Sequence, residues 1–338
     1  MESIQTHVIK AWHSRYSWVR LLWPISLVFR VLVFFRRLVL CSLYQGQKYS
    51  SPVVVVGNIS VGGCGKTPLL IALANQLIDR GLNIAIVSRG YGAVASSYPV
   101  QVNLDTLAAD CGDEPLLIRQ SLPLKNCIVV VDPNRSRGVS YALEQFNCDL
   151  VLCDDGLQHY RLHRDVEIAV IDGDRGLGNK HCLPAGPLRE PASRLKSVDF
   201  VVINGESGLG DDIAVNASFN LKPKSFRNLS SGEIIDINRW AGGKTVHALA
   251  AIGNPKRFAD TLELLGFEVI LQGYDDHETM TRSDLMLEDD YPVIITAKDA
   301  VKFSSIDLPH VWVLDVEAEV SSGFIDNLLT AVGLNQSI

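Results

Sequence analysis

The amino-acid sequence predicts an α/β protein with a mostly parallel sheet that is covered by helices on both faces. Three observations support this fold class. Short apolar runs alternate with helical patterns from residue 52 onward, and a glycine-rich segment directly follows the first apolar run. The composition is 47% hydrophobic and 20% charged, as in ordinary globular proteins, and 338 residues are enough for two domains.

The strands predicted in the first half of the chain are short apolar runs bounded by turn residues. They lie at Val53–Val56, Ile84–Val87, Cys127–Val131, Leu150–Cys153, Glu167–Ile171 and Phe200–Ile203. After the first run, leucine recurs at helical spacing at positions 70, 73 and 77. Because parallel strands need crossover connections, this alternation predicts right-handed units and a sheet buried on both faces.

The second half begins with a segment of different composition. Residues 206–243 are rich in Gly, Ser, Asn and Asp without strong periodicity, which predicts a boundary or linker. The elements expected beyond it are strands at Val246–Ile252, Glu268–Leu271, Val293–Thr296 and Val311–Val316, and helices near Arg257–Leu265 and Gly323–Val332. We therefore expect an N-terminal segment (1–48), a first α/β domain (49–225) and a smaller C-terminal α/β domain (226–338) that closes over a cleft.

The N-terminal segment is basic and rich in aromatic residues. Residues 1–50 carry a formal charge of +6, whereas the rest of the chain carries −13. Within residues 17–44 the longest uncharged stretch, Leu21–Phe29, has nine residues, fewer than the roughly 20 that span a bilayer. We expect Pro24 to kink or restart the helix. The pattern favours a membrane-associated helix lying in the interface without secure spanning, the alternative being a helix packed on the protein's own core.

Charge and cysteine content exclude other classes of protein. The net charge of −7 argues against a nucleic-acid binder, which is usually basic. The seven cysteines form no Cys-x-x-Cys pair, and several lie within apolar runs, which predicts buried thiols, a cytoplasmic body and no zinc site.

The glycine-rich segment has the composition of a phosphate-binding loop. VVVVGNISVGGCGKT is an apolar strand, a glycine-rich turn and a Lys-Thr pair that opens a helix. Backbone amides of such a loop bind phosphates, the lysine reaches the β- and γ-phosphates, and the threonine hydroxyl binds Mg²⁺. The predicted phosphate site is Ser60, Val61, Gly62, Gly63, Cys64, Gly65, Lys66 and Thr67.

This motif predicts a P-loop NTPase-like domain with ATP and Mg²⁺ as cofactors. One departure is Ser60, where the motif has glycine. Because Cys64 lies in the loop, we also expect bulky thiol reagents to inactivate the protein and Mg-ATP to protect it.

Acidic residues supply the second half of the predicted site. The run DLVLCDDG is an apolar strand that ends in two aspartates, and Asp154 or Asp155 should hold Mg²⁺ directly or through water. Asp113 opens a predicted helix, where an N-cap role is the structural alternative. Asp276 and His277 form a carboxylate–imidazole pair suited to removing a proton from a hydroxyl, although a histidine in such a turn is more often simply exposed.

Taken together, these motifs resemble the tetraacyldisaccharide 4′-kinase family, the lipid A 4′-kinases of Gram-negative bacteria. The matching runs are GNISVGGCGKTP (57–68), SRGYG (88–92), GDEP (112–115), DDGLQHYRLHRD (154–165), DGDRGLGN (172–179), LPAGPLREP (183–191), AIGNPKRF (251–258), DDH (275–277) and TAKDAVK (296–302). They keep their order and spacing across about residues 50–305. Departures are Ala297, where glutamate is frequent, and Cys64 at a variable position.

The resemblance implies transfer of the ATP γ-phosphoryl group to the 4′-hydroxyl of a lipid A disaccharide 1-phosphate, forming lipid IVA. It implies two α/β/α domains and an N-terminal helix on the cytoplasmic face of the inner membrane, without an obligate protein partner. By position, Asp113 corresponds to the catalytic aspartate and His277 to its partner, with Lys66 and Asp155 also catalytic. Candidate contacts to phosphate or substrate are Gln158, His159, Arg161 and Arg189.

Two other classes of function are weighed against this one. A P-loop GTPase or metallochaperone requires a guanine-reading Asn/Thr-Lys-x-Asp motif, and the nearest candidate, Ala297–Ala300, fails at its first and last positions. A peripheral membrane scaffold that binds nucleotide without turnover has no use for Asp113 and His277. A dinucleotide oxidoreductase is disfavoured, because no G-x-G-x-x-G follows a strand.

Overall fold

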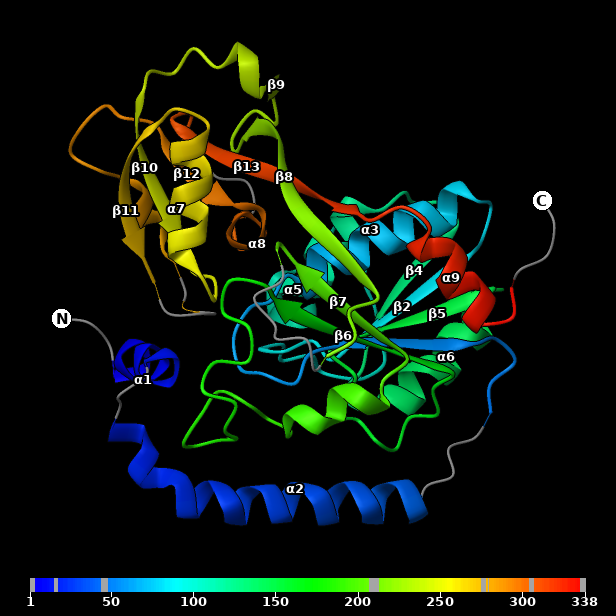
Figure 1. Ribbon diagram of the computed structural model, residues 1–338. Coiled ribbons are helices and arrows are strands. Elements are labelled where there is room, and N and C mark those ends of the chain that lie inside the picture. The colour runs from blue at the N-terminus through cyan, green and yellow to red at the C-terminus, as the bar shows by residue number, and fades with distance from the viewer. Residues whose placement is uncertain are drawn as a thin grey trace. The chain divides into compact units, whose positions relative to one another are not determined.

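A computed structural model describes residues 4–14, 18–43, 48–206, 213–274, 278, 280–303 and 307–334 (Figure 1). His277, one of the predicted site residues, lies outside these ranges. The chain divides into two compact units. Unit 1 comprises Met1–Asn220 and Ala318–Ile338, and unit 2 comprises Leu221–Glu317.

The sheet of unit 1 is parallel except at one edge. Its strand order is β8-β7-β6-β1-β5-β2-β4-β3, and every neighbouring pair in this series of described strands is parallel except β3–β4, which is antiparallel. The bounds are β1 (Val53–Gly57), β2 (Ile84–Ser88), β3 (Val100–Gln101), β4 (Cys127–Val131), β5 (Leu150–Asp154), β6 (Val166–Asp172), β7 (Phe200–Asn204) and β8 (Ala217–Asn228). All six strands predicted in this half are confirmed, to within one residue at either end.

Helices cover both faces of this sheet. Every residue of β1, β2, β4 and β5 is buried, and successive side chains of a strand point to opposite faces, so neither face is open to water. The helices of unit 1 beyond residue 50 are α3 (Lys66–Asp79), α4 (Ala108–Cys111), α5 (Asp113–Ser121), α6 (Arg135–Gln145), α9 (Phe324–Ala331) and the 3-10 helix η2 (Ala192–Ser197). The fold class predicted from the sequence is confirmed.

The N-terminal segment forms α1 (Ile4–His13), the 3-10 helix η1 (Trp18–Leu22) and the long helix α2 (Trp23–Leu43). Pro24 is the second residue of α2, where its missing N–H costs no helical hydrogen bond, so the predicted restart is confirmed. One side of α2 contacts the body of unit 1. The Ser26 hydroxyl donates to the Cys182 carbonyl at 2.7 Å, and Phe29 packs against the core.

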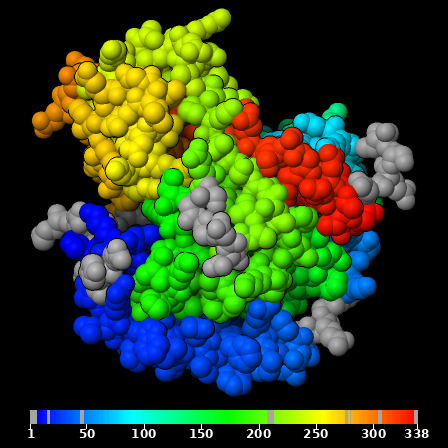
Figure 2. All heavy atoms as spheres, in the orientation of Figure 1, coloured from blue at the N-terminus to red at the C-terminus, as the bar shows by residue number. Residues whose placement is uncertain are grey.

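The opposite side of α2 is apolar and exposed, and α2 forms the blue surface at the lower edge of Figure 2. The exposed large side chains are Trp23, Ile25, Leu27, Val28, Val31, Leu32, Phe34, Phe35, Leu38, Val39 and Leu43. Despite this apolar surface, none of the helices in the described ranges has the length and hydropathy that crossing a bilayer requires.

Unit 2 has the strand order β11-β10-β12-β13-β8, with parallel pairs β10–β11, β10–β12 and β12–β13. Its elements are β9 (Ile234–Asp236), η3 (Ile237–Arg239), β10 (Thr245–Ala250), α7 (Pro255–Leu264), β11 (Glu268–Gly273), η4 (Arg282–Leu285), β12 (Val293–Thr296), α8 (Ala297–Ala300) and β13 (Val311–Val320). The strands β8 and β13 each run through the boundary between the units.

The division between the units, Asn220 to Leu221, falls within residues 206–243, where a boundary or linker was predicted. The segment is not a linker without secondary structure, because it contains the 12-residue strand β8 and the short strand β9, which pair antiparallel. The middle of β8 holds Lys222, Pro223 and Lys224, residues that are depleted in strands. Its ends are held by buried aromatic side chains, Phe219 and Phe226, and not by a continuous apolar run.

Candidate active site

Polar residues mark the carboxyl ends of the parallel strands in unit 1. Each of the six strands from β1 to β7, apart from β3, ends in or is followed by a buried polar side chain. These are Asn58, Ser88, Asp132, Asp154, Asp172 and Asn204. Burying polar groups is costly, and ligands of parallel α/β sheets bind at the carboxyl ends of the strands. The most polar edge of the sheet is therefore the candidate site.

The loop between β1 and α3 has the backbone of a phosphate cradle. Gly62 and Gly65 have φ values of +98° and +86°, which side chains other than glycine rarely adopt. Within the described residues, the backbone amides of Gly62 to Gly65 donate to no backbone carbonyl. The buried side-chain amide of Asn204, at the end of β7, donates to the Cys64 carbonyl at 3.2 Å and holds the loop against the sheet. Free amides beside the start of a helix favour an anion.

The substitution of Ser60 for the usual glycine has a structural explanation. Ser60 does not have a positive φ and forms an antiparallel bridge with Leu188, so no glycine is required there. The neighbouring amide of Val61 donates to the Pro187 carbonyl at 2.8 Å, and the Arg189 amide donates to the Ile59 carbonyl at 2.7 Å. The run LPAGPLREP thus lies along the loop and braces it.

Lys66 and Asp155 face each other across this edge. The Lys66 Nζ lies 3.3 Å from Asp155 Oδ1, and the Arg189 Nη1 lies 3.4 Å from Asp155 Oδ2. Burial alone would raise the pKa of Asp155, but the two cations outweigh it and hold the pKa below its usual range. Burial alone would lower the pKa of Lys66, yet the acidic groups around it raise that pKa. Both groups are therefore charged at neutral pH.

Asp155 also has an unusual backbone. Its φ is +47°, in the left-handed region that non-glycine residues seldom occupy, at a cost of about 1 kcal/mol or more. The turn carries the Asp155 side chain from the end of β5 toward Lys66. Backbone strain of this kind concentrates at functional sites.

Asp154 is the more buried member of the acidic pair, at 1% exposure. Its Oδ2 accepts a hydrogen bond from the Ser88 hydroxyl at 3.1 Å, while its Oδ1 has no hydrogen-bond partner within the described ranges. Burial, followed by the charges of Glu114 and Asp155, raises the pKa of Asp154 to about 7. An unsatisfied buried carboxylate oxygen is suited to bind a metal ion or a metal-bound water.

The residues at this edge fit Mg²⁺ with nucleotide. Thr67 lies in the first turn of α3, and Asp154 and Asp155 lie at the end of the neighbouring strand, since β1 pairs with β5. No group of three or more His, Cys, Asp or Glu side chains that could hold a metal alone occurs in the described part of the chain. Mg²⁺ in nucleotide sites keeps several waters and is bound through one or two carboxylates together with phosphates.

Asp113 is the first residue of α5, and Gly112, with a φ of +91°, is the N-cap. The alternative role of Asp113 as an N-cap is therefore wrong. Its neighbour Glu114 was missed by sequence reasoning, although its charge acts on both Lys66 and Asp154. The only signal in the sequence was an adjacent pair of acids at the start of a helix. The pairing of Asp113 with His277 falls outside the described residues and remains a prediction.

Of the other predicted contacts, Gln158 is held internally. Its side-chain amide donates to the Asn58 carbonyl at 2.9 Å and to Glu190 Oε1 at 2.7 Å. His159 is partly buried, and its Nε2 has no partner among the described residues. Burial, then the nearby arginines, lower the pKa of His159 to about 4, so it is neutral at pH 7. Arg161 is exposed.

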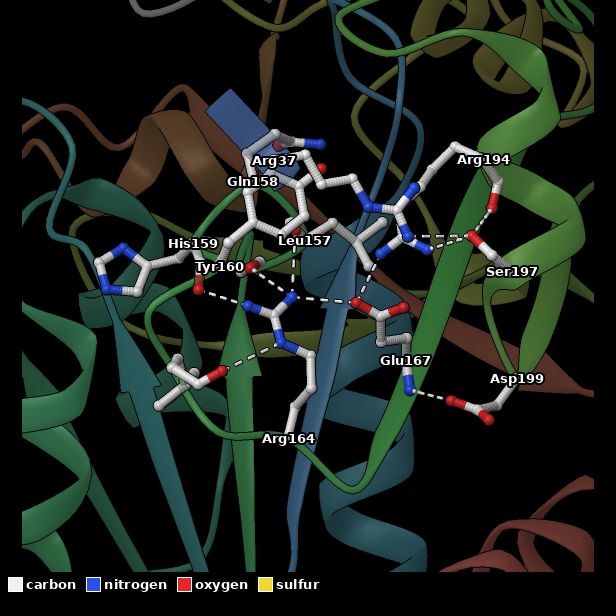
Figure 3. A network of polar contacts seen from close by, with 12 residues as sticks. Arg37, Leu157, Gln158, His159, Tyr160, Arg164, Glu167, Arg194, Ser197 and Asp199 are labelled. Atoms are coloured by element: carbon white, nitrogen blue, oxygen red, sulfur yellow. Dashed lines mark hydrogen bonds and ion pairs between the residues drawn. The ribbon is translucent and has the colours of Figure 1, made fainter. Parts of the chain in front are cut away.

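A buried ionic network supports the turn that carries these residues (Figure 3). Tyr160 donates to Glu190, and Arg194 lies 3.4 Å from Glu190 Oε2. Figure 3 shows Arg164 and Arg194 both reaching Glu167, at 3.0 and 2.5 Å. Sequence reasoning missed this network, because it depends on contacts such as Tyr160–Glu190, which join residues 30 positions apart. Glu190 also accepts a hydrogen bond from Gln158, whose side chain contacts the residue after β1, so the network reaches the carboxyl end of β1.

A glycine-rich loop after the central strand, with an acidic pair on the neighbouring strand, defines a P-loop nucleotide-binding protein. The sequence model of one family, LpxK, tetraacyldisaccharide-1-P 4′-kinase, matches residues 18–333. The chain belongs to this family.

Individual relatives cover nearly the whole chain. The tetraacyldisaccharide 4′-kinase of Ectopseudomonas mendocina is 44% identical over 96% of both chains, and that of Hahella chejuensis is 42% identical over 95% of both. Among solved structures, LpxK from Aquifex aeolicus in complex with ATP matches with a TM-score of 0.73 at 26% identity, covering 93% of this chain and 98% of that one.

The structure changes the expectation for thiol reagents. Cys64 is 2% exposed, and burial raises the pKa of its thiol. Six of the seven cysteines are buried and only Cys41 is exposed. In the native protein we expect the Cys41 thiol to react rapidly with an aromatic disulfide reagent, and the six buried thiols to react only on unfolding. Peptide mapping after brief labelling measures this, and rapid labelling at Cys64 would contradict it.

Proposed function

We propose that this protein transfers the γ-phosphoryl group of ATP to the 4′-hydroxyl of a tetraacyldisaccharide 1-phosphate, the lipid A precursor, and forms lipid IVA. The observation that carries the proposal is the juxtaposition of the phosphate loop with Asp154 and Asp155 at one strand edge, in a chain of the 4′-kinase family. The solved Aquifex relative was crystallised with ATP, which supports the choice of nucleotide.

Each group at the edge has a role in this reaction. The amides of Gly62 to Gly65 would hold the phosphates, and Lys66 would exchange its contact with Asp155 for the γ-phosphate oxygens. Thr67, Asp154 and Asp155 would hold Mg²⁺, which supplies positive charge to the phosphoryl oxygens when bound. Arg189, 3.4 Å from Asp155, is placed to clamp a phosphate of ATP or of the acceptor.

The acceptor hydroxyl needs a base as it attacks phosphorus. We assign this role to Asp113, at the start of α5, with His277 as its partner. The neutral His159, with one unpartnered ring nitrogen, is a candidate to orient the acceptor or a phosphate.

We further propose that the enzyme works on the cytoplasmic face of the bacterial inner membrane. The exposed apolar side of α2 together with the basic N-terminal segment supports an interfacial position, since such helices bury apolar side chains among lipid headgroups. A membrane-bound enzyme then needs to reach only the sugar headgroup, while the acyl chains stay in the bilayer.

The test is transfer of label from γ-labelled ATP to a lipid A disaccharide 1-phosphate, beside an acyl-free disaccharide and with GTP as competing nucleotide. We expect labelled lipid, weaker transfer to the acyl-free sugar, and little competition by GTP. The guanine-reading motif is absent from Ala297–Ala300, which forms the short helix α8 of unit 2. No transfer to the lipid would reject the proposed reaction, and equal use of GTP would reject the choice of nucleotide.

A further inference from the structure

The segment that braces the phosphate loop also receives contacts from the helices α1 and α2. This bracing segment, residues 179–188, lies between β6 and β7 in the sequence and belongs to unit 1, as α1 and α2 do. In Figure 1 the helix α1 lies beside the green loops of this region of the chain. The bracing segment therefore joins the N-terminal helices to the phosphate loop.

Each of the two helices donates a side-chain hydrogen bond to a carbonyl group of the bracing segment. The indole Nε1 of Trp12, the penultimate residue of α1, donates to the Pro184 carbonyl at 3.0 Å. The Ser26 hydroxyl of α2 donates to the Cys182 carbonyl at 2.7 Å. In return, the Asn179 amide donates to the Trp12 carbonyl at 3.0 Å. Both donor side chains are buried, so water competes poorly for these bonds.

Ser26 is an unusual residue for its position. It is the one buried residue among those that the structure describes in α2, and it is polar. A hydroxyl is costly to bury unless it is hydrogen-bonded, so an apolar residue would be the ordinary choice at a contact made only for packing. The bond to Cys182 is therefore a specific attachment of α2 to the bracing segment.

Hydrogen bonds within the bracing segment make it compact. The Leu188 amide donates to the His181 carbonyl at 3.1 Å, and the Leu188 carbonyl accepts from the Leu183 amide at 2.9 Å. Gly186 has no room for a side chain, since a Cβ atom there would lie 2.1 Å from Asn179 Oδ1. Closely packed segments transmit displacement, so a shift where the helices contact this one would also move Leu188.

The end of the bracing segment fixes the backbone of the phosphate loop. Leu188 pairs with Ser60 in an antiparallel bridge, and the Pro187 carbonyl accepts from the Val61 amide. Val61 directly precedes Gly62, the first of the amides that would hold the phosphates. A loop that is already ordered in its binding conformation loses less conformational freedom when the ligand binds, which raises affinity.

We propose that Trp12 and Ser26 are positioning residues for nucleotide binding. They hold the bracing segment where it orders the phosphate loop, whether or not a lipid surface is present. Their role rests on the proposed function only in that ATP is taken as the ligand of the phosphate loop, and it is independent of the acceptor.

The test measures the dissociation constant of a non-hydrolysable ATP analogue with Mg²⁺ by calorimetry, on the full-length protein in a non-ionic detergent without lipid. Trp12→Phe removes the indole donor and keeps an aromatic ring, and Ser26→Ala removes the hydroxyl. Each change should raise the dissociation constant about threefold, and the double variant about tenfold, because a single hydrogen bond shifts an equilibrium by factors of this size. Trp18→Phe and Ser42→Ala make the same changes at exposed positions of the N-terminal segment and should leave it unchanged.

Hydrogen exchange of the nucleotide-free protein reports on the brace directly. The Val61 amide, which is bonded to the Pro187 carbonyl, should exchange faster in the double variant, whereas the amides of β4 should exchange as in the wild type. Since coupling between two sites is reciprocal, the ATP analogue should slow exchange of the Asn179 amide in the wild type. A variant that was only less stable would exchange faster in β4 as well and would lose binding-competent protein without a change in the dissociation constant.

Contrary results are separable from a failure of the proposed function. An unchanged dissociation constant in the double variant, or an equal increase in the Trp18 and Ser42 controls, would reject the positioning role. Faster exchange throughout the sheet with unchanged affinity would assign Trp12 and Ser26 to stability alone. If the wild type bound no nucleotide, the proposed function and the positioning role would fail together; if the wild type and the double variant bound equally well, only the positioning role would fail.

Discussion

Replacing Lys66 by methionine is expected to lower kcat for phosphoryl transfer by about 10³-fold, with a smaller change in KM for ATP. Methionine keeps most of the side-chain volume but removes the charge. Lys66 is the one lysine at the phosphate loop, and the acidic groups around it keep it protonated. Charge develops on the phosphoryl oxygens in the transition state, so the loss falls mainly on kcat.

The measurement is initial-rate transfer from γ-labelled ATP to the lipid acceptor at saturating concentrations of both substrates. Lys125→Met is the matched control, because Lys125 is an exposed lysine of the same unit outside this site, and its rate should equal that of the wild type. Lys66→Arg, which keeps the charge with a different shape, should recover part of the loss. A rate for Lys66→Met within about tenfold of the wild type would remove Lys66 from the chemistry.

The sheet of unit 1 was predictable because its strands obey a local rule. Its central strands are short and largely apolar runs, as parallel strands buried on both faces usually are. The strand β8 has no such signature, since Lys222 and Lys224 lie at its centre and only its ends are anchored by buried residues. It pairs with β7, β9 and β13, and β13 is distant from it in the sequence.

Some residues of the candidate site could be predicted from local sequence, and others could not. The loop and the acidic pair were found because phosphate and Mg²⁺ need fixed residue types at fixed spacing from a strand. The brace of the loop by Leu188 and the bond from Gln158 to Glu190 depend on contacts over 32 residues or more, which no local pattern encodes. The left-handed backbone of Asp155 was not predicted either, because aspartate tolerates a positive φ better than most residues but adopts it at only a minority of positions.

The two aspartates of the acidic pair differ in what burial does to them. Asp154 is almost fully buried and its pKa is raised to about 7, chiefly by burial, so above that pH the fold carries a poorly solvated charge. Asp155 is held ionised by Lys66 and Arg189, and its pKa is lowered. Changing either one to asparagine should abolish most of the activity, yet we expect opposite effects on stability.

Without nucleotide and Mg²⁺, Asp154→Asn is expected to increase the free energy of unfolding at pH 8 by on the order of 1–4 kcal/mol. Between about pH 4 and 7 the folded state keeps a proton on Asp154 that the unfolded state has lost, so the wild type loses stability as pH rises through this window and the variant does not. The gain should therefore vanish near pH 4.

Asp155→Asn should instead destabilise the protein at pH 8, because it breaks two ion pairs, although asparagine tolerates the same left-handed backbone. This loss of stability should shrink only below about pH 4. Urea unfolding at about pH 2, 4, 6 and 8 measures both effects, and a loss of stability at pH 8 in Asp154→Asn would show that its carboxylate is not the destabilised group of the site.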